Sequence, residues 1–153
     1  MRSAVATALV AVVVIASAAC TRDRARSAEL SRQDADRALI DRNWMDAWPT
    51  DKDERLRLYR FTPSMGGGVY QDRTMFKGQF ELFQYQAGAG AIEFQFPDTA
   101  EHVRAPFTIE RVSGPAPFDL KLTIAHDPRG PGVYYATSGK QGQALDLLAR
   151  PRR

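Results

Sequence analysis

Between residues 39 and 138 the sequence is a series of eight short runs rich in aromatic and β-branched residues, most of them separated by Gly, Pro, Asp or Ser. Runs of this length and composition, bounded by turn-forming residues, are typical of β-strands. The runs comprise residues 40–48, 55–62, 68–76, 78–86, 91–97, 106–112, 118–126 and 132–138. Their spacing and short connections predict a mainly β domain, a single small up-and-down meander barrel of about eight antiparallel strands.

The alternation of apolar and polar residues indicates which runs have one face exposed to solvent. Residues 92–96, 107–112 and 120–124 alternate, as expected of strands with one side packed on a core. The runs at 55–62 and 78–86 change phase part-way, so that apolar residues occupy both faces. Each change predicts either a β-bulge or a strand that is covered on both sides.

The first run has two interpretations. Ile40, Trp44 and Trp48 are four residues apart, which fits one face of a helix, yet all stand at even positions, which fits one face of a strand. The alternative fold is therefore α+β, with an N-terminal helix packed on a curved antiparallel sheet.

The N-terminus has the pattern of an export signal. Arg2 is the only charged residue before Arg22, and residues 4–16 are almost entirely Ala, Val, Leu and Ile. The run ends in Ala16-Ser17-Ala18-Ala19-Cys20, which resembles the lipobox of bacterial lipoproteins. The resemblance implies acylation of Cys20, the only cysteine, and attachment to a membrane through its acyl chains. Cleavage after Ala18 by ordinary signal peptidase and retention as a transmembrane anchor are the alternatives.

These patterns divide the chain into four parts. Residues 1–19 are the predicted lipoprotein signal peptide, and residues 20–38 are the lipidated cysteine and a polar tether, within which residues 27–41 can form a helix. Residues 39–138 are the β domain. Residues 139–153 are a C-terminal tail that can form a short helix.

The β domain has a second resemblance. An early tryptophan, a hairpin-rich β series and the stretch from Gly78 through Phe96 to Ile124 resemble the small lipocalin-like domains of bacterial envelope proteins. Arg42 stands where true lipocalins have a glycine two residues before the tryptophan. The resemblance implies a lipocalin-like barrel.

Aromatic residues are the richest functional feature, at 10% of the chain. They are interpreted as core, as a face that contacts a partner protein, or as the lining of an apolar pocket. The candidate ligand-binding residues are Trp44, Phe80, Phe94 and Phe107. We expect a non-catalytic binding or accessory role through an aromatic surface that contacts an envelope partner. The alternative is a carrier or sensor of a small hydrophobic ligand inside the barrel.

The remaining composition argues against other classes of function. His102 and His126 are the only histidines and have no spaced metal-ligating partners, and no nucleophile elbow or phosphate-binding glycine loop is found. We expect no catalytic residue, metal or cofactor. Removing Arg2 with the signal lowers the formal charge from +3 to +2, which argues against nucleic-acid binding. Thr21 follows the cysteine, where lipoproteins retained in the inner membrane carry Asp. This implies a bacterial envelope protein anchored in the outer membrane and facing the periplasm.

Overall fold

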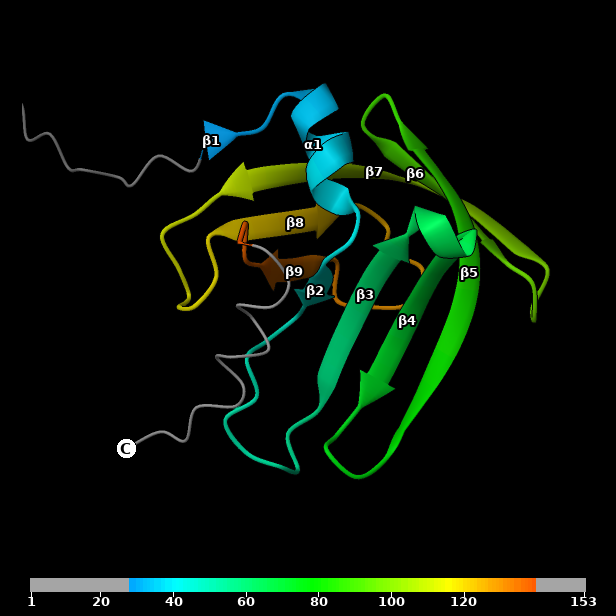
Figure 1. Ribbon diagram of the computed structural model, residues 1–153. Coiled ribbons are helices and arrows are strands. Elements are labelled where there is room, and N and C mark those ends of the chain that lie inside the picture. The colour runs from blue at the N-terminus through cyan, green and yellow to red at the C-terminus, as the bar shows by residue number, and fades with distance from the viewer. Residues whose placement is uncertain (1–27, 140–153) are drawn as a thin grey trace, which may run out of the picture.

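Eight antiparallel strands, paired in the order in which they occur in the chain, close into a barrel (Figure 1). The computed structural model describes residues 28–139. The barrel strands are β2 (Asn43–Met45), β3 (Leu56–Thr62), β4 (Gly67–Arg73), β5 (Gly78–Gly88), β6 (Ala91–Phe96), β7 (Glu101–Arg111), β8 (Leu120–Ile124) and β9 (Val133–Ala136). The barrel closes where Met45 pairs with Tyr135, and the predicted up-and-down meander is confirmed.

The folded domain begins earlier in the chain than predicted. Residues 28–38, assigned to the tether, form strand β1 (Ala28–Glu29), which pairs with the end of β7, and most of helix α1 (Arg32–Leu39). The Ser31 side chain caps α1 by accepting a hydrogen bond from the Asp34 backbone N–H. The tether assignment is wrong for these residues because Ala35 and Leu39, four apart on one helix face, are buried in the core.

Helix α1 lies across the end of the barrel where β3, β5 and β7 finish (Figure 1). The first predicted run starts just after it, so Trp44 lies in β2 and Ile40 forms a single bridge with Phe61. Trp44 is fully buried, and its indole N–H donates to the Leu39 carbonyl at 2.9 Å. This bond fixes the end of α1 on the barrel.

Two predicted features of the strands differ from the structure. The connection predicted over residues 98–105 is mostly strand, because β7 begins at Glu101. The exposed His102 and Arg104 give this stretch the composition of a loop, although Ala105 faces inward and is buried. The phase changes in β3 and β5 are not bulges, since both strands keep a regular register with their neighbours.

The two phase changes have different causes. Strand β3 is covered on both faces, as one of the alternatives predicted: its interior face carries aromatic rings, and on its outer face Leu58 packs with Met45 and Phe118 in a second apolar cluster. Strand β5 is not covered outside, because Phe83 points into the core while Phe80 and Leu82 are exposed. The sequence expectation was therefore wrong for β5.

Replacing Trp44 with Phe is expected to destabilise the domain by about 2 kcal/mol, because the Leu39 carbonyl loses its buried donor and a small cavity forms. Trp48→Phe is the matched control. Trp48 is only partly buried and meets Phe118 edge-on at 5.8 Å, so its replacement should cost less than about 1 kcal/mol. Urea unfolding followed by circular dichroism measures both, and equal losses would contradict this role of Trp44.

Candidate functional site

The four residues predicted to bind a ligand do not form one site. Trp44, Phe94 and Phe107 are buried inside the barrel, at 0%, 1% and 5% exposure. Phe80 lies on the outer face of β5 and is 72% exposed. The predicted lipidation residue, Cys20, lies outside the described residues.

The barrel interior is occupied by aromatic side chains. The ring of Tyr59 stands at the centre, and its centroid lies 4.8–5.8 Å from those of Phe61, Tyr70, Phe83, Phe94 and Tyr134. Phe96 extends the cluster by stacking on Phe94 at 5.8 Å. The space that a carrier would need for its ligand is filled by the protein's own core.

The end of the barrel opposite α1 is closed by the loop between β8 and β9. Asp127 in this loop accepts hydrogen bonds from the hydroxyls of Tyr59 (2.8 Å) and Tyr134 (2.5 Å). It also accepts from the backbone N–H groups of Arg129 (3.0 Å) and Gly132 (3.1 Å). Both carboxylate oxygens thus have two donors, which joins the loop to the barrel core.

Arg129 fastens the same loop to the wall of the barrel. Its guanidinium donates to both oxygens of Glu81 (2.5 and 3.0 Å) and lies 2.8 Å from a Glu101 oxygen. It also sits 3.8 Å from the ring centroid of Phe96, a cation–π contact. Tyr70 completes the closure by donating its hydroxyl to the Arg129 carbonyl at 2.8 Å.

Sequence reasoning missed this network because its members are far apart in the chain. Asp127 stands in the connection between the predicted runs at 118–126 and 132–138, and nothing local connects it with Tyr59, 68 residues earlier. The polar groups of the network are paired with one another, so the arrangement suits structural closure better than reaction with a substrate.

Burial sets the protonation of the tyrosines in this network. Burial, followed by the nearby Asp127 carboxylate, raises the pKa of both Tyr59 and Tyr134 far above the ordinary value for tyrosine. Burial also raises the pKa of Tyr70 to about 12. The hydrogen bonds to Glu81 raise the pKa of the Arg129 guanidinium. At neutral pH the tyrosines are therefore protonated donors and Arg129 is charged.

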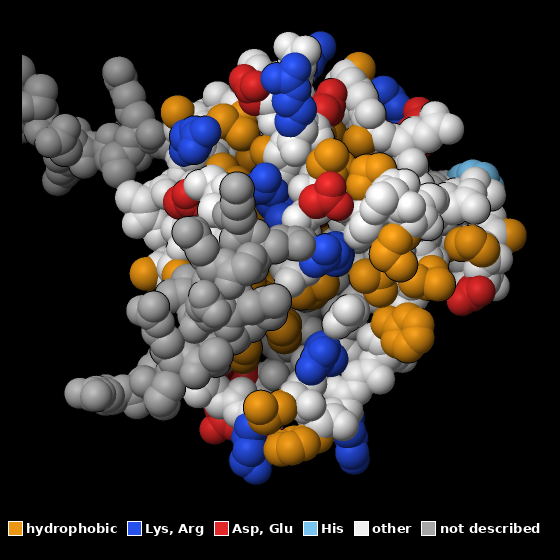
Figure 2. All heavy atoms as spheres, viewed as in Figure 1, with side chains coloured by type: hydrophobic (Ala, Val, Ile, Leu, Met, Phe, Trp, Pro, Cys, Tyr) orange, Lys and Arg blue, Asp and Glu red, His pale blue; other side chains and the backbone are white. Residues whose placement is uncertain are grey.

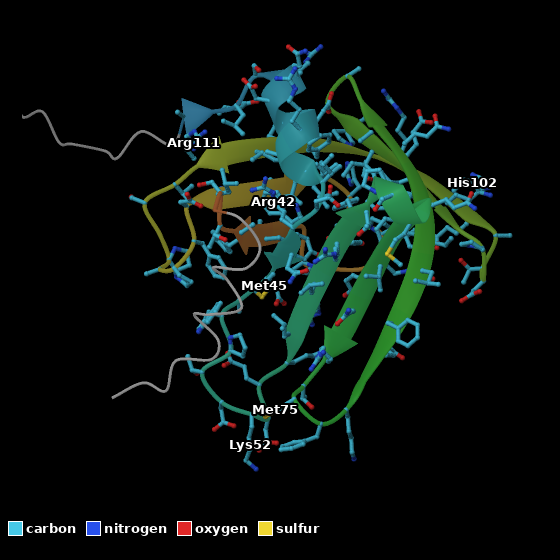
Figure 3. All side chains as sticks on the ribbon, in the orientation of Figure 1. Arg42, Met45, Lys52, Met75, His102 and Arg111 are labelled. Carbon is cyan, nitrogen blue, oxygen red and sulfur yellow. The ribbon has the colours of Figure 1, made fainter. Side chains whose placement is uncertain are left out.

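The unexplained feature of the molecule is an exposed apolar surface on the hairpin formed by β4 and β5. Five large apolar side chains that are 59–83% exposed belong to this region, and we call them the hairpin surface: Met65, Met75, Phe76, Phe80 and Leu82. Phe80 and Leu82 lie on β5, Met75 and Phe76 in the turn, and Met65 in the 3-10 turn η1 (Pro63–Met65) that precedes β4. Figure 2 shows apolar side chains gathered over this side of the barrel and at the hairpin tip, where Figure 3 labels Met75.

A hollow of about 360 Å³ lies at the tip of the hairpin, with Phe76 and Phe80 in its lining. Arg73 and Lys77 also line it, and neither side chain has an ion pair with a described residue. The turn itself is well held, because Thr74 and Lys77 bond through their backbones at 2.7 Å and the Thr74 hydroxyl accepts from the Lys77 N–H at 3.2 Å. The hollow therefore combines three apolar side chains, those of Met75, Phe76 and Phe80, with polar residues and with two cations that have no ion pair in the described part of the chain.

In comparisons with known proteins, no family model, curated protein or solved structure matches the chain. Within residues 28–139 no helix has the length and apolar character needed to cross a bilayer, and no cluster of three or more His, Cys, Asp or Glu side chains is arranged to hold a metal ion.

The free energy of unfolding is expected to fall as the pH rises above about 10. Tyrosines ionise near pH 10 in the unfolded chain, while Tyr59 and Tyr134 stay protonated in the fold because their pKa values are raised. The stabilisation is complete below that pH and decreases by about 1.4 kcal/mol per pH unit for each such tyrosine.

Tyr134→Phe removes one of these groups and should make the slope shallower by about 1.4 kcal/mol per pH unit relative to the wild type. Denaturant titrations between pH 9 and pH 11.5 measure the slope of each protein. Identical slopes would contradict the raised pKa of Tyr134.

Proposed function

We propose that this protein is a lipid-anchored bacterial envelope protein with a non-catalytic role, which uses the hairpin surface to bind an envelope protein. The observation that carries the proposal is the exposure of the five apolar side chains of the hairpin surface on a domain whose interior is already filled. Large apolar side chains with this exposure are unfavourable in water, and a region that carries several of them usually marks a contact site.

The filled interior supports binding at the outside over carriage within. Helix α1 lies across one end of the barrel, and the Asp127 and Arg129 loop closes the other. A ligand inside would have to displace the aromatic core and break the tyrosine–carboxylate bonds, whereas the hairpin surface is open to a partner.

The anchor is supported by the sequence Ala16-Ser17-Ala18-Ala19-Cys20, which ends eight residue steps before Ala28. The described chain starts at β1, which pairs with residues 110–111 of β7, beside the end that carries α1. The turn at residues 74–77 lies at the opposite end, since each strand of the meander reverses direction (Figure 1). An anchor at Cys20 would thus leave the hairpin tip directed away from its membrane.

Mass spectrometry of the mature N-terminus is the direct test of the anchor. We expect a chain that begins at Cys20 and carries two or three acyl groups, which are enough to hold a protein stably on a bilayer. Cys20→Ser should abolish the acylation and release the protein from membranes. A mature chain that begins at Ala19 without acyl groups would overturn the proposed anchor.

Replacing Phe80 and Leu82 together with Ser is expected to reduce formaldehyde cross-linked complexes in envelope preparations at least fivefold. Both side chains are exposed, so the unfolding free energy should change by less than about 0.5 kcal/mol. Thr108→Ala on the exposed face of β7 is the control and should leave the complexes unchanged. Complexes unaffected by the double substitution would show that the hairpin surface is not the binding site.

A further inference from the structure

We infer that the hairpin surface binds an acidic, apolar segment of its partner protein, with a carboxylate of that segment in the hollow between Phe76 and Phe80. This inference rests on the proposed function and specifies the chemistry of the partner at the same site.

The hollow fits an anionic group. Arg73 and Lys77 line it, no Asp or Glu does so, and both cations lack an ion pair with any residue in the described range. Lys52 also lies nearby, with its ammonium 5.5 Å from the ring centroid of Phe76, but it is paired with Asp53 at 3.5 Å, so the cations of the hollow without an ion pair to a described residue are Arg73 and Lys77. Cations that the fold itself leaves unneutralised are available to a negatively charged partner.

The surroundings of the hollow fit apolar side chains. Phe80 and Leu82 stand two residues apart on one face of β5, a separation of about 7 Å along the strand. Phe76 and Met75 line the hollow together with Phe80. A segment that places apolar residues on both sides of an Asp or Glu would cover these side chains while its carboxylate meets Arg73 and Lys77.

A second copy of this chain is less suited to the hairpin surface than an acidic, apolar protein segment. A two-fold contact would bring each hairpin surface against the same patch of the other molecule. The cations at the hollow would then approach one another without an acidic side chain from its lining to separate them. Such like-charge contacts disfavour association.

The bilayer that holds the proposed anchor is also less suited to the hairpin surface than an acidic, apolar protein segment. Eight residue steps separate Cys20 from Ala28 and span at most about 28 Å. The 11 residues of β5 extend about 36 Å from the hairpin tip toward the end of the barrel where β1 lies. Barrel strands tilt by about 35–45° from the barrel axis, so this length corresponds to a height of about 28 Å. A barrel that rests on its hairpin tip would therefore require the segment between Cys20 and Ala28 to be almost fully extended, which costs conformational entropy.

The test is site-specific photo-cross-linking in cells, with the photoreactive residue p-benzoylphenylalanine in place of Phe80 in the full-length chain. We expect a product with an envelope protein, and mass spectrometry of the joined peptides should place the cross-link in a segment with Asp or Glu beside apolar residues. Photoreactive residues in place of Thr108, on the exposed outer face of β7, should give at least tenfold less product.

Charge reversal tests the hollow itself. Arg73→Glu with Lys77→Glu should reduce the yield of the product at least tenfold, while Arg73→Lys with Lys77→Arg should keep it within twofold of the wild type. Arg104→Glu, an exposed charge on β7, is the matched control and should leave the yield unchanged. Unchanged melting temperatures would show that the variants fold.

The possible outcomes separate this inference from the proposed function. Joining to lipid, to a second copy or to a segment without acidic residues would overturn the inference, as would a full yield after charge reversal. If Phe80→Ser with Leu82→Ser still removes the complexes in those cases, the proposed function stands. If it does not, both fall.

Discussion

The fold depends on Tyr59, whose side chain takes part in both the apolar packing and the polar closure of the barrel. Its ring lies among five other aromatic rings at the barrel centre, while its hydroxyl donates to Asp127 in the loop that closes one end. A buried hydroxyl without a partner costs about 1–3 kcal/mol. The core can therefore keep this arrangement only while the loop is in place, and the loop is held in turn by Tyr134 and by Arg129 on Glu81.

This coupling restricts where the protein can meet another molecule. At one end, Leu39 of α1 is part of the core, and at the other the Asp127 carboxylate is fully engaged with its donors. Between these two ends, the rings of the central cluster fill the interior of the barrel. The parts of the structure that can change without disturbing this packing are the outward-facing positions of the strands and the connecting turns.

The number and order of the strands could be predicted because a period of two is a local property of the sequence. The N-terminal boundary could not be predicted, since α1 is polar apart from Ala35, Ala38 and Leu39. The segment therefore resembles a solvated linker until the barrel end that Ala35 and Leu39 cover is known. The Asp127 network was invisible for a different reason: its bonds join residues as many as 68 positions apart. Phe80 was recognised as a candidate for binding, but it was grouped with core residues because sequence alone does not say which face of a strand is inside.

The phase changes in β3 and β5 look alike in the sequence, but the outward-facing apolar residues of the two strands differ in the structure. Those of β3 stabilise the fold, and those of β5 do not. On the outer face of β3, Leu58 is covered by Phe118 and Met45, so its apolar character contributes burial to the stability of the domain. On the outer face of β5, Phe80 and Leu82 have no such cover, and the core is complete on the opposite face of the same strand. Polar residues at these two positions would satisfy the fold equally well, and this is the reason for which we propose a contact outside the domain at Phe80 and Leu82.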